Sequence, residues 1–218
     1  LDFIFPKKCV SCGAYGAYLC KKCAALVEFV EHPVCPVCQR QAIGGKTHPI
    51  CRTKYSLDGL IVAVKYRGPV KTLISKLKYK YVSDIGEVLV TLIAQNFWRY
   101  EAGQKLMLVP IPLHKRRKNW RGFNQAEVIT SIISAKFGVD VSNMLVRVIE
   151  TKTQVGFKAE DRKKNIKNAF RLAGNVDKNI LYILVDDVFT TGATMNEACK
   201  VLKKAGAGEV WGMVVAVG

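Results

Sequence analysis

The apolar positions of this chain fall into two alternating patterns. Short, nearly continuous apolar runs predict buried strands at 58–66, 106–111, 145–149, 180–185 and 209–217, and the last of these is expected to close the sheet. Between them, apolar residues recur every three or four positions, which predicts helices at 70–79, 84–100, 124–137 and 195–205. Strands that alternate with helices favour a parallel sheet covered on both faces, so the predicted fold class is α/β.

A strand, a loop and a helix follow one another near the end of the chain. The run 180–185 is followed by Asp186 and Asp187, and then by a small, hydroxyl-rich loop made of Thr190, Thr191, Gly192, Ala193 and Thr194. Backbone N–H groups of such a loop at a helix N-terminus form a concave anion site. The two carboxylates suit ribose hydroxyls or a hard cation such as Mg²⁺. The alternative without a ligand is an ordinary buried strand that ends at an Asp-Asp helix cap.

This segment differs from the common nucleotide-binding motifs. It has no Gly-Lys-Ser/Thr ending, which excludes a P-loop, and no G-x-G-x-x-G, which excludes a dinucleotide fingerprint. It resembles the phosphoribosyl-pyrophosphate (PRPP) loop of type I phosphoribosyltransferases. That resemblance implies that Asp186 and Asp187 hold the ribose and that 190–194 holds the 5′-phosphate.

A second candidate segment follows the predicted strand 106–111. It has a rigid Pro-x-Pro and a dense basic run, and its candidate residues for diphosphate or Mg²⁺ are Pro110, Pro112, Lys115, Arg116 and Arg117. The carboxyl ends of parallel strands share one edge of a sheet, so we expect this loop near the phosphate loop. Asn124 is the expected N-cap of the next helix. The alternative is a solvated basic loop.

A third segment carries polar residues that could close over a ligand. Its candidate mobile-loop residues are Gln154, Arg162 and Asn165, and Gly156 would give the loop freedom to move. A surface hairpin with no ligand role is the alternative.

Seven of the eight cysteines lie within the first 51 residues. They form three Cys-x-x-Cys pairs and one His-x-x-Cys pair, which predict two tetrahedral zinc sites with the ligands Cys9, Cys12, Cys20, Cys23, Cys35, Cys38, His48 and Cys51. The simplest pairing takes the first four for one ion and the last four for the other, and a crossed arrangement stays open. Four protein ligands leave no open position for catalysis, so both ions are expected to be structural. The eighth, Cys199, fits buried packing on a helix.

Disulfides are the competing use of these cysteines. Four short pairs and a cytoplasmic setting disfavour them. The cytoplasmic location is itself an expectation, because no apolar run approaches the ~20 residues of a membrane helix and no secretory segment is evident. The predicted domains are a double zinc ribbon at 1–54 and an α/β domain at 55–218.

The charge of the chain points to a polyanionic partner or a phosphate-rich substrate. It has 34 basic and 17 acidic residues, a formal net charge of +17. Single-stranded nucleic acid needs a cationic track with aromatic faces, and the candidates are Lys76, Lys78, Tyr79, Lys80 and Arg121. Packing of a helix end is the alternative for Tyr79.

Taken in order, these segments resemble the ComF family, which includes the GntX-like proteins. The carrying motifs are the cysteine pairs, Val109-Pro110-x-Pro112, the run from Arg121 to Gln125, Arg162-x-x-Asn165 and the loop from Asp186 to Thr194. One departure is His48, where the family usually has cysteine. The resemblance implies a type I phosphoribosyltransferase-like parallel sheet flanked by helices, with a small N-terminal zinc-ribbon domain.

The resemblance also implies two functions. The first is a competence protein that binds PRPP with Mg²⁺ and handles single-stranded DNA during natural transformation, beside other DNA-uptake proteins such as a helicase. The alternative is an active, GntX-like phosphoribosyltransferase with an unidentified acceptor. No residue in the sequence is an obvious general base for that acceptor, so catalytic residues are not assigned.

Overall fold

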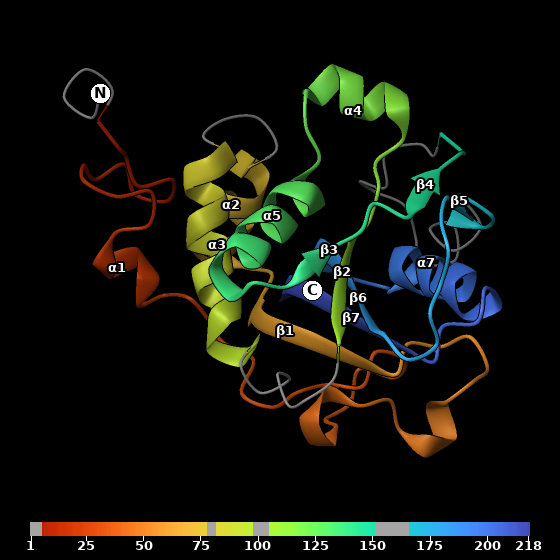
Figure 1. Ribbon diagram of the computed structural model, residues 1–218. Helices are drawn as coiled ribbons and strands as arrows, with labels where there is room; N and C mark the ends of the chain where they lie inside the picture. The colour runs from red at the N-terminus through yellow and green to blue at the C-terminus, as the bar shows by residue number, and fades with distance from the viewer. Residues whose placement is uncertain (1–5, 78–81, 98–104, 151–165) are drawn as a thin grey trace.

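The computed structural model describes residues 6–77, 82–97, 105–150 and 166–218 (Figure 1). Its centre is a five-stranded, wholly parallel sheet in the order β1-β7-β6-β2-β3. The strands are β1 (Gly59–Lys65), β2 (Leu106–Pro110), β3 (Asp140–Val141), β6 (Leu181–Phe189) and β7 (Glu209–Val217). No described helix is long and apolar enough to cross a bilayer.

Helices cover both faces of this sheet, as the apolar pattern predicts. Three helices pack on one face: α2 (Gly68–Leu77), α3 (Val82–Phe97) and α5 (Gln125–Phe137). The other face carries α7 (Ala193–Lys204) and a two-stranded antiparallel sheet of β4 (Leu145–Arg147) and β5 (Phe170–Leu172). Alternate residues of β6 enter the two cores, with Ile183 in the first and Leu184 in the second. The predicted α/β class is therefore confirmed.

Four predicted elements differ from the observed ones. Run 145–149 is not in the main sheet: β4 pairs with β5, and the short β3 takes the edge. Strand β7 lies inside the sheet between β1 and β6. Strand β6 continues past the two aspartates to Phe189, because β7 keeps pairing with it. Residues Lys115–Arg121 form a helix, α4, where a loop was expected.

Local caps explain where the helices near the strand ends begin and stop. The Asn124 side chain accepts a hydrogen bond from the Ala126 N–H at 3.1 Å, which confirms it as the N-cap of α5. Gly122 ends α4 in the left-handed region and donates its N–H to the Lys118 carbonyl at 2.7 Å. The chain between the two helices is therefore a tight, defined turn.

The N-terminal region runs along the free edge of β1. Its short helical segments are α1 (Lys21–Ala24), η1 (Ile43–Gly45) and η2 (Pro49–Cys51). The Val30 N–H donates to the Ala63 carbonyl at 3.0 Å, and the Lys65 N–H donates to the Glu28 carbonyl at 2.8 Å. Main-chain groups of the edge strand are thus satisfied by the N-terminal segment, which protects that edge from other chains.

Candidate functional site

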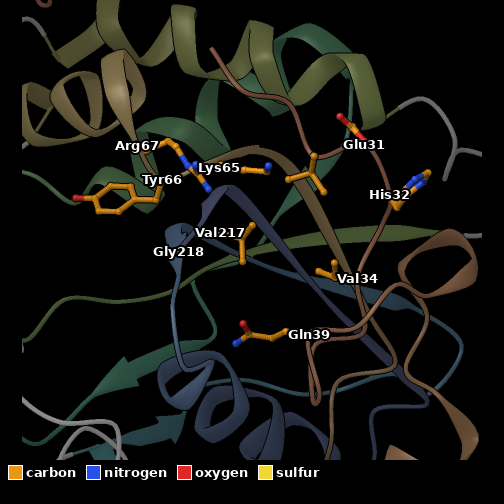
Figure 2. Close-up of a pocket in the computed structure, with 10 residues that line it drawn as sticks. Glu31, His32, Val34, Gln39, Lys65, Tyr66, Arg67, Val217 and Gly218 are labelled. Carbon is orange, nitrogen blue, oxygen red and sulfur yellow. The ribbon is translucent and has the colours of Figure 1, made fainter. Parts of the chain in front are cut away.

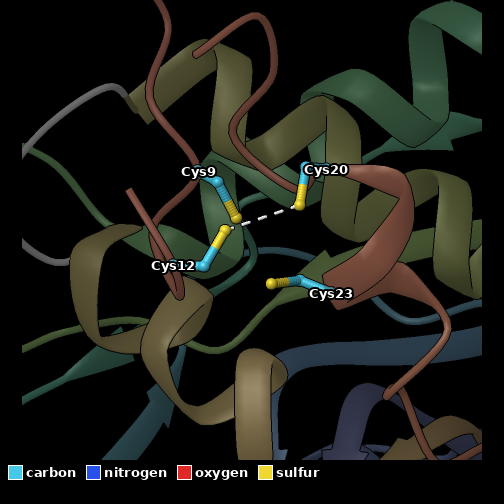
Figure 3. Close-up of side chains that lie close together, drawn as sticks. All are labelled: Cys9, Cys12, Cys20 and Cys23. Atoms are coloured by element: carbon cyan, nitrogen blue, oxygen red, sulfur yellow. Dashed lines mark hydrogen bonds between the residues drawn. The ribbon is translucent and has the colours of Figure 1, made fainter. Parts of the chain in front are cut away.

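The first cysteine cluster has the geometry of a zinc site. The sulfur atoms of Cys9, Cys12, Cys20 and Cys23 all lie within 4.8 Å of one another and point toward a common centre (Figure 3). The Cys12 and Cys20 sulfurs are 3.6 Å apart. Tetrahedral zinc with bonds of about 2.3 Å places its sulfurs about 3.8 Å apart, so these four residues fit the ion.

The second cluster contains Cys35, Cys38, His48 and Cys51, again within 4.8 Å. Nδ1 of His48 lies 3.4 Å from the Cys38 sulfur, while Nε2 lies 2.9 Å from the Gln41 carbonyl. A histidine that ligates zinc usually donates its other ring N–H to a neighbouring acceptor, and Gln41 provides that acceptor. Both clusters use neighbouring pairs in sequence order, so the simplest predicted pairing is the one observed.

Backbone donors lower the pKa of the leading thiol in each cluster, whereas the pKa of the last thiol is raised, to about 12 for Cys23 and about 11 for Cys51. Burial would raise the pKa of Cys9, but N–H groups of Cys20, Cys12 and Ser11 lower it to about 6. The pKa of Cys35 falls to about 7 through the same competition, with its donors at Cys38, His48 and Val37. A thiol that ionises near neutral pH ligates zinc readily.

The predicted phosphate loop lies at the carboxyl end of β6, next to the Pro-x-Pro segment. Pro110 pairs in register with Val185, and the Ile111 N–H donates to the Val185 carbonyl at 2.9 Å. Asn124 reinforces this turn because its side-chain amide donates to the Ile111 carbonyl at 2.9 Å. The structure therefore brings the two predicted segments together at one edge of the sheet.

Gly192 sets the shape of the phosphate loop. It is the N-cap of α7, with φ of +70°, and the Thr191 hydroxyl accepts a long hydrogen bond of 3.4 Å from the N–H of Ala193, the first residue of the helix. A Cβ at this position would lie 2.5 Å from Cζ of Phe189, so the loop has no room for a side chain. The Asn196 N–H donates to the Gly192 carbonyl at 2.8 Å, which begins the helix directly behind the loop.

The two aspartates lie within a strand and not after it. Neighbouring residues of a strand face opposite sides of the sheet, so Asp186 and Asp187 point to different faces. The Asp187 N–H also donates to Oδ1 of Asp186 at 2.8 Å. A single ligand at the strand end would therefore meet the two carboxylates from different directions.

Arg147, on β4, is a candidate that sequence reasoning missed. Only 9% of its surface is exposed. Its pKa falls to about 10, chiefly because of burial and also because of the positive charge of Arg117, while the negative charge of Asp186 opposes the shift. A buried guanidinium that interacts electrostatically with another cation and with a carboxylate is suited to an anionic ligand. The clue in the sequence is an arginine inside the apolar run 145–149.

Helix α4 carries the basic run at the rim of this site. Lys115 and Arg116 are exposed and Arg117 is partly buried. Arg116 forms an ion pair with Glu150 at 2.7 Å, and both side chains are largely exposed, so the pair contributes little to stability. Of the predicted diphosphate residues, Pro110 and Pro112 thus lie at the end of β2, and Lys115, Arg116 and Arg117 lie on α4.

Two buried polar atoms close to this turn lack hydrogen-bond partners within the described part of the chain. They are Nδ1 of His114 and Nε2 of Gln125. Buried polar groups normally have a partner, in the protein, water or ligand. Gln125 is the first residue of α5 and is only 4% exposed. These atoms provide unused hydrogen-bonding capacity beside the Pro-x-Pro turn.

A cavity of about 570 Å³ lies between the N-terminal region and the carboxyl ends of β1 and β7 (Figure 2). Its lining residues are Val30, Glu31, His32, Val34, Gln39, Lys65, Tyr66, Arg67, Val217 and Gly218. The Gln39 amide also donates to the Thr190 carbonyl at 2.8 Å. The cavity is therefore next to the phosphate loop.

The remaining candidates are only partly described. Lys76, on α2, is exposed, and Arg121, the last residue of α4, is partly buried. Trp120 next to it is 73% exposed. Lys78, Tyr79 and Lys80 lie outside the described residues, as do the mobile-loop candidates Gln154, Arg162 and Asn165.

Comparisons with known proteins found a matching family model, similar sequences and one similar structure. A family model described as a double zinc ribbon domain matches residues 1–53. Competence protein F of Haemophilus influenzae is 36% identical over 72% of this chain and 73% of its own length. DNA utilization protein YhgH of Salmonella typhimurium is 35% identical over 70% of each chain. Adenine phosphoribosyltransferase from Leishmania tarentolae aligns over 67% of this chain and 60% of its own, at 14% identity and a TM-score of 0.39.

The ribbon match agrees with the two clusters, and the long alignments with competence protein F and YhgH extend well beyond the ribbons into the α/β core. This chain belongs to the ComF/YhgH family of competence and DNA-utilization proteins.

Proposed function

We propose that this chain binds PRPP at the carboxyl ends of β2 and β6 and holds single-stranded DNA on its basic surface. One observation carries the first half of the proposal. Asp186 and the loop from Thr190 to Thr194 lie at the end of β6, beside the Pro110 turn, and buried Arg147 interacts electrostatically with Asp186 and Arg117. Acid, hydroxyl and cationic groups are thus available to the ribose and the phosphates of one ligand.

Each part of the proposed ligand has its own group of residues. The 5′-phosphate accepts from N–H groups at the start of α7, where the helix dipole favours an anion. The ribose hydroxyls donate to Asp186 and Asp187. The diphosphate lies against the Pro110–Pro112 turn, where Arg147 and Arg117 supply positive charge.

Mg²⁺ would reach this site together with the diphosphate. Its preferred ligands are oxygen atoms, which the aspartates and the phosphates offer. Bound there, the ion would neutralise charge on the diphosphate. The protein groups orient the ribose and hold the phosphates on either side of it.

The DNA half of the proposal is supported by the relatives and by charge. Relatives are named for competence and for DNA utilization, and this chain has a formal net charge of +17. Exposed Trp120 lies beside Arg121, which places an aromatic face next to a cation. That combination binds single strands through stacking and phosphate contacts. We place this activity in the cytoplasm, alongside other DNA-uptake proteins.

The alternative function is transfer of the phosphoribosyl group to an acceptor. The cavity of about 570 Å³ favours it, because an acceptor needs space close to the phosphate loop. Transfer would break the bond between ribose C1 and the diphosphate and form a bond from C1 to the acceptor. Release of diphosphate with an acceptor present would establish this reaction, and a broad acceptor screen without release would exclude it.

Thermal unfolding tests the PRPP site directly. PRPP with Mg²⁺ is expected to raise the Tm of the zinc-loaded wild type, because a ligand that binds only the folded state stabilises it. The double variant Asp186→Asn, Asp187→Asn should lose this increase and keep two zinc ions. Asp140→Asn, which removes an exposed carboxylate from β3, is the matched control. An unchanged increase in the double variant would refute the assignment.

A further inference from the structure

The second zinc ribbon contacts the phosphate loop directly. Nε2 of Gln39 donates a hydrogen bond of 2.8 Å to the Thr190 carbonyl, which joins residues 151 positions apart. In Figure 2 the Gln39 side chain extends from the ribbon into the space beneath Val217. Gln39 directly follows the zinc ligand Cys38, so the contact connects the second cluster to the first residue of the loop.

The zinc knuckle fixes the position of Gln39. Its backbone is in the left-handed region, with φ of +57°, which is uncommon for a residue other than glycine. The Gln39 N–H donates to the Cys35 carbonyl at 2.9 Å, and the Cys35 N–H donates to the Arg40 carbonyl at 2.9 Å. This tight turn allows Cys35 and Cys38 to bind one metal ion. Binding of that ion therefore fixes the backbone position of Gln39, from which its side chain extends.

The contact in turn orients the phosphate loop. The sheet already holds the Phe189 carbonyl, which accepts from the Gly218 N–H at 3.0 Å. Gln39 holds the next carbonyl, that of Thr190. In a trans peptide the carbonyl and the following N–H point in opposite directions, and the described residues contain no cis peptide. Fixing the Thr190 carbonyl toward the ribbon therefore turns the Thr191 N–H away from it, toward the inside of the loop.

We propose that Gln39 is a positioning residue of the phosphate loop and that zinc in the second cluster is thermodynamically coupled to PRPP binding. This inference rests on the proposed function and adds that zinc in the second cluster regulates PRPP binding. Coupling between two binding sites is reciprocal, so PRPP must also strengthen zinc binding at the second cluster. The first cluster provides an internal control, because its neighbours Val10, Tyr18 and Leu19 pack on the helical core of α2 and α3 and not on the loop.

The substitution must remove the hydrogen bond without straining the turn. Gln39→Asn shortens the side chain by one methylene and tolerates a left-handed backbone, and Gln39→Gly removes the side chain and relaxes the turn. Gln41→Asn is the matched control: it lies in the same ribbon, and its observed link to the cluster uses its backbone carbonyl.

Calorimetry of PRPP with Mg²⁺ is the first measurement. Loss of one net hydrogen bond should weaken PRPP binding about threefold to fivefold in both Gln39 variants, with Gln41→Asn unchanged. Each variant must first retain two zinc ions per chain. If the wild type takes up no PRPP, the proposed function fails. If the wild type binds and both Gln39 variants bind equally well, this inference alone fails.

Zinc release to a chromogenic chelator is the second measurement, and it separates coupling from a general loss of stability. PRPP should slow the release of one of the two ions in the wild type and should not slow it in Gln39→Asn. His48→Cys, which changes one ligand of the second cluster, assigns the affected phase to that cluster. The coupling would be overturned if PRPP slowed the release of both zinc ions equally or of the first cluster's ion alone. It would also be overturned if PRPP slowed zinc release in Gln39→Asn as much as in the wild type.

Discussion

At the residue scale, two positions, Gly192 and Arg147, shape the proposed site at the end of β6. Gly192 gives the loop a left-handed turn where Phe189 leaves no room for a Cβ. Arg147 is a buried cation that interacts electrostatically with Asp186. Both residues are in positions where ordinary packing would favour a different side chain, and such exceptions are typical of functional sites.

Gly192→Ala is predicted to destabilise the fold by about 2–3 kcal/mol, because it adds a steric clash to the strain of a left-handed alanine. Gly138→Ala is the control, since Gly138 has φ of +65° but nothing within 4 Å of a Cβ. Urea unfolding of both variants isolates the clash with Phe189. Equal losses in the two variants would contradict the close packing of the loop.

Arg147→Met is predicted to keep the fold and to weaken PRPP binding by about 1.5–3 kcal/mol, the range for a hydrogen bond to a charged group. Methionine fills the buried volume without a charge, so stability should stay the same or rise. Arg171→Met changes an exposed arginine of β5, in the same small sheet, and should leave binding unchanged. Calorimetry that finds wild-type affinity for Arg147→Met would remove this residue from the site.

At the scale of elements, the predicted boundaries are accurate where an apolar run is continuous and inaccurate where tertiary contacts decide. Strand β1 and helix α5 lie within one residue of their predicted ends at 58–66 and 124–137. Helix α4 was missed because a basic run has no apolar face; Gly122 and the ion pair of Lys118 with Glu127 at 2.7 Å stabilise it instead. Local patterns carry no information about such partners.

Asp58 links three parts of the chain through hydrogen bonds and ion pairs. Its carboxylate accepts from Arg52 at 2.7 Å, from Lys203 of α7 at 2.6 Å and from the Val210 N–H of β7 at 2.8 Å. Burial would raise its pKa, but the hydrogen bonds from Lys203 and Arg52 outweigh burial and hold the pKa below its usual value of 3.8. A depressed pKa in the folded state stabilises the protein above the unfolded value and loses that effect as pH falls through the folded one.

Asp58→Asn is therefore predicted to lower stability by about 3 kcal/mol at neutral pH, since it leaves Lys203, whose side chain is only 11% exposed, without its charge partner. The difference in Tm between wild type and variant should be constant from pH 5 to 7. Below a pH of about 4 it should shrink as Asp58 in the wild type becomes protonated. A difference that stays constant down to pH 3 would show that the carboxylate does not titrate with folding.

At the scale of the whole molecule, a hydrogen bond joins the second zinc ribbon to the loop that follows the central strand β6. The two metal-ligand clusters and the succession of strand, loop and helix at 180–205 could be predicted because each pattern is local in the sequence. The contact of Gln39 with Thr190 could not, since it joins positions 39 and 190 and depends on how the N-terminal region runs along β1. The burial of Arg147 likewise depends on β4 leaving the main sheet.

Single-stranded DNA binding is predicted to weaken linearly with log salt concentration, with a slope of about −0.7 for each phosphate neutralised. Arg121→Ala should reduce the magnitude of that slope by about 0.7, because it removes one phosphate contact. Trp120→Ala should weaken binding by about 1–3 kcal/mol with the slope unchanged, because stacking releases no counterions. Fluorescence anisotropy with a labelled oligonucleotide measures both. A flat salt response would contradict binding on the basic surface.

The central claim is that the end of β6 forms a site for a sugar phosphate. Isothermal titration calorimetry of PRPP with Mg²⁺ into wild-type protein that carries two zinc ions tests it most directly. The account predicts saturable uptake of one PRPP per chain, with competition by ribose 5-phosphate. Absence of any uptake of PRPP or ribose 5-phosphate by this folded protein would contradict it.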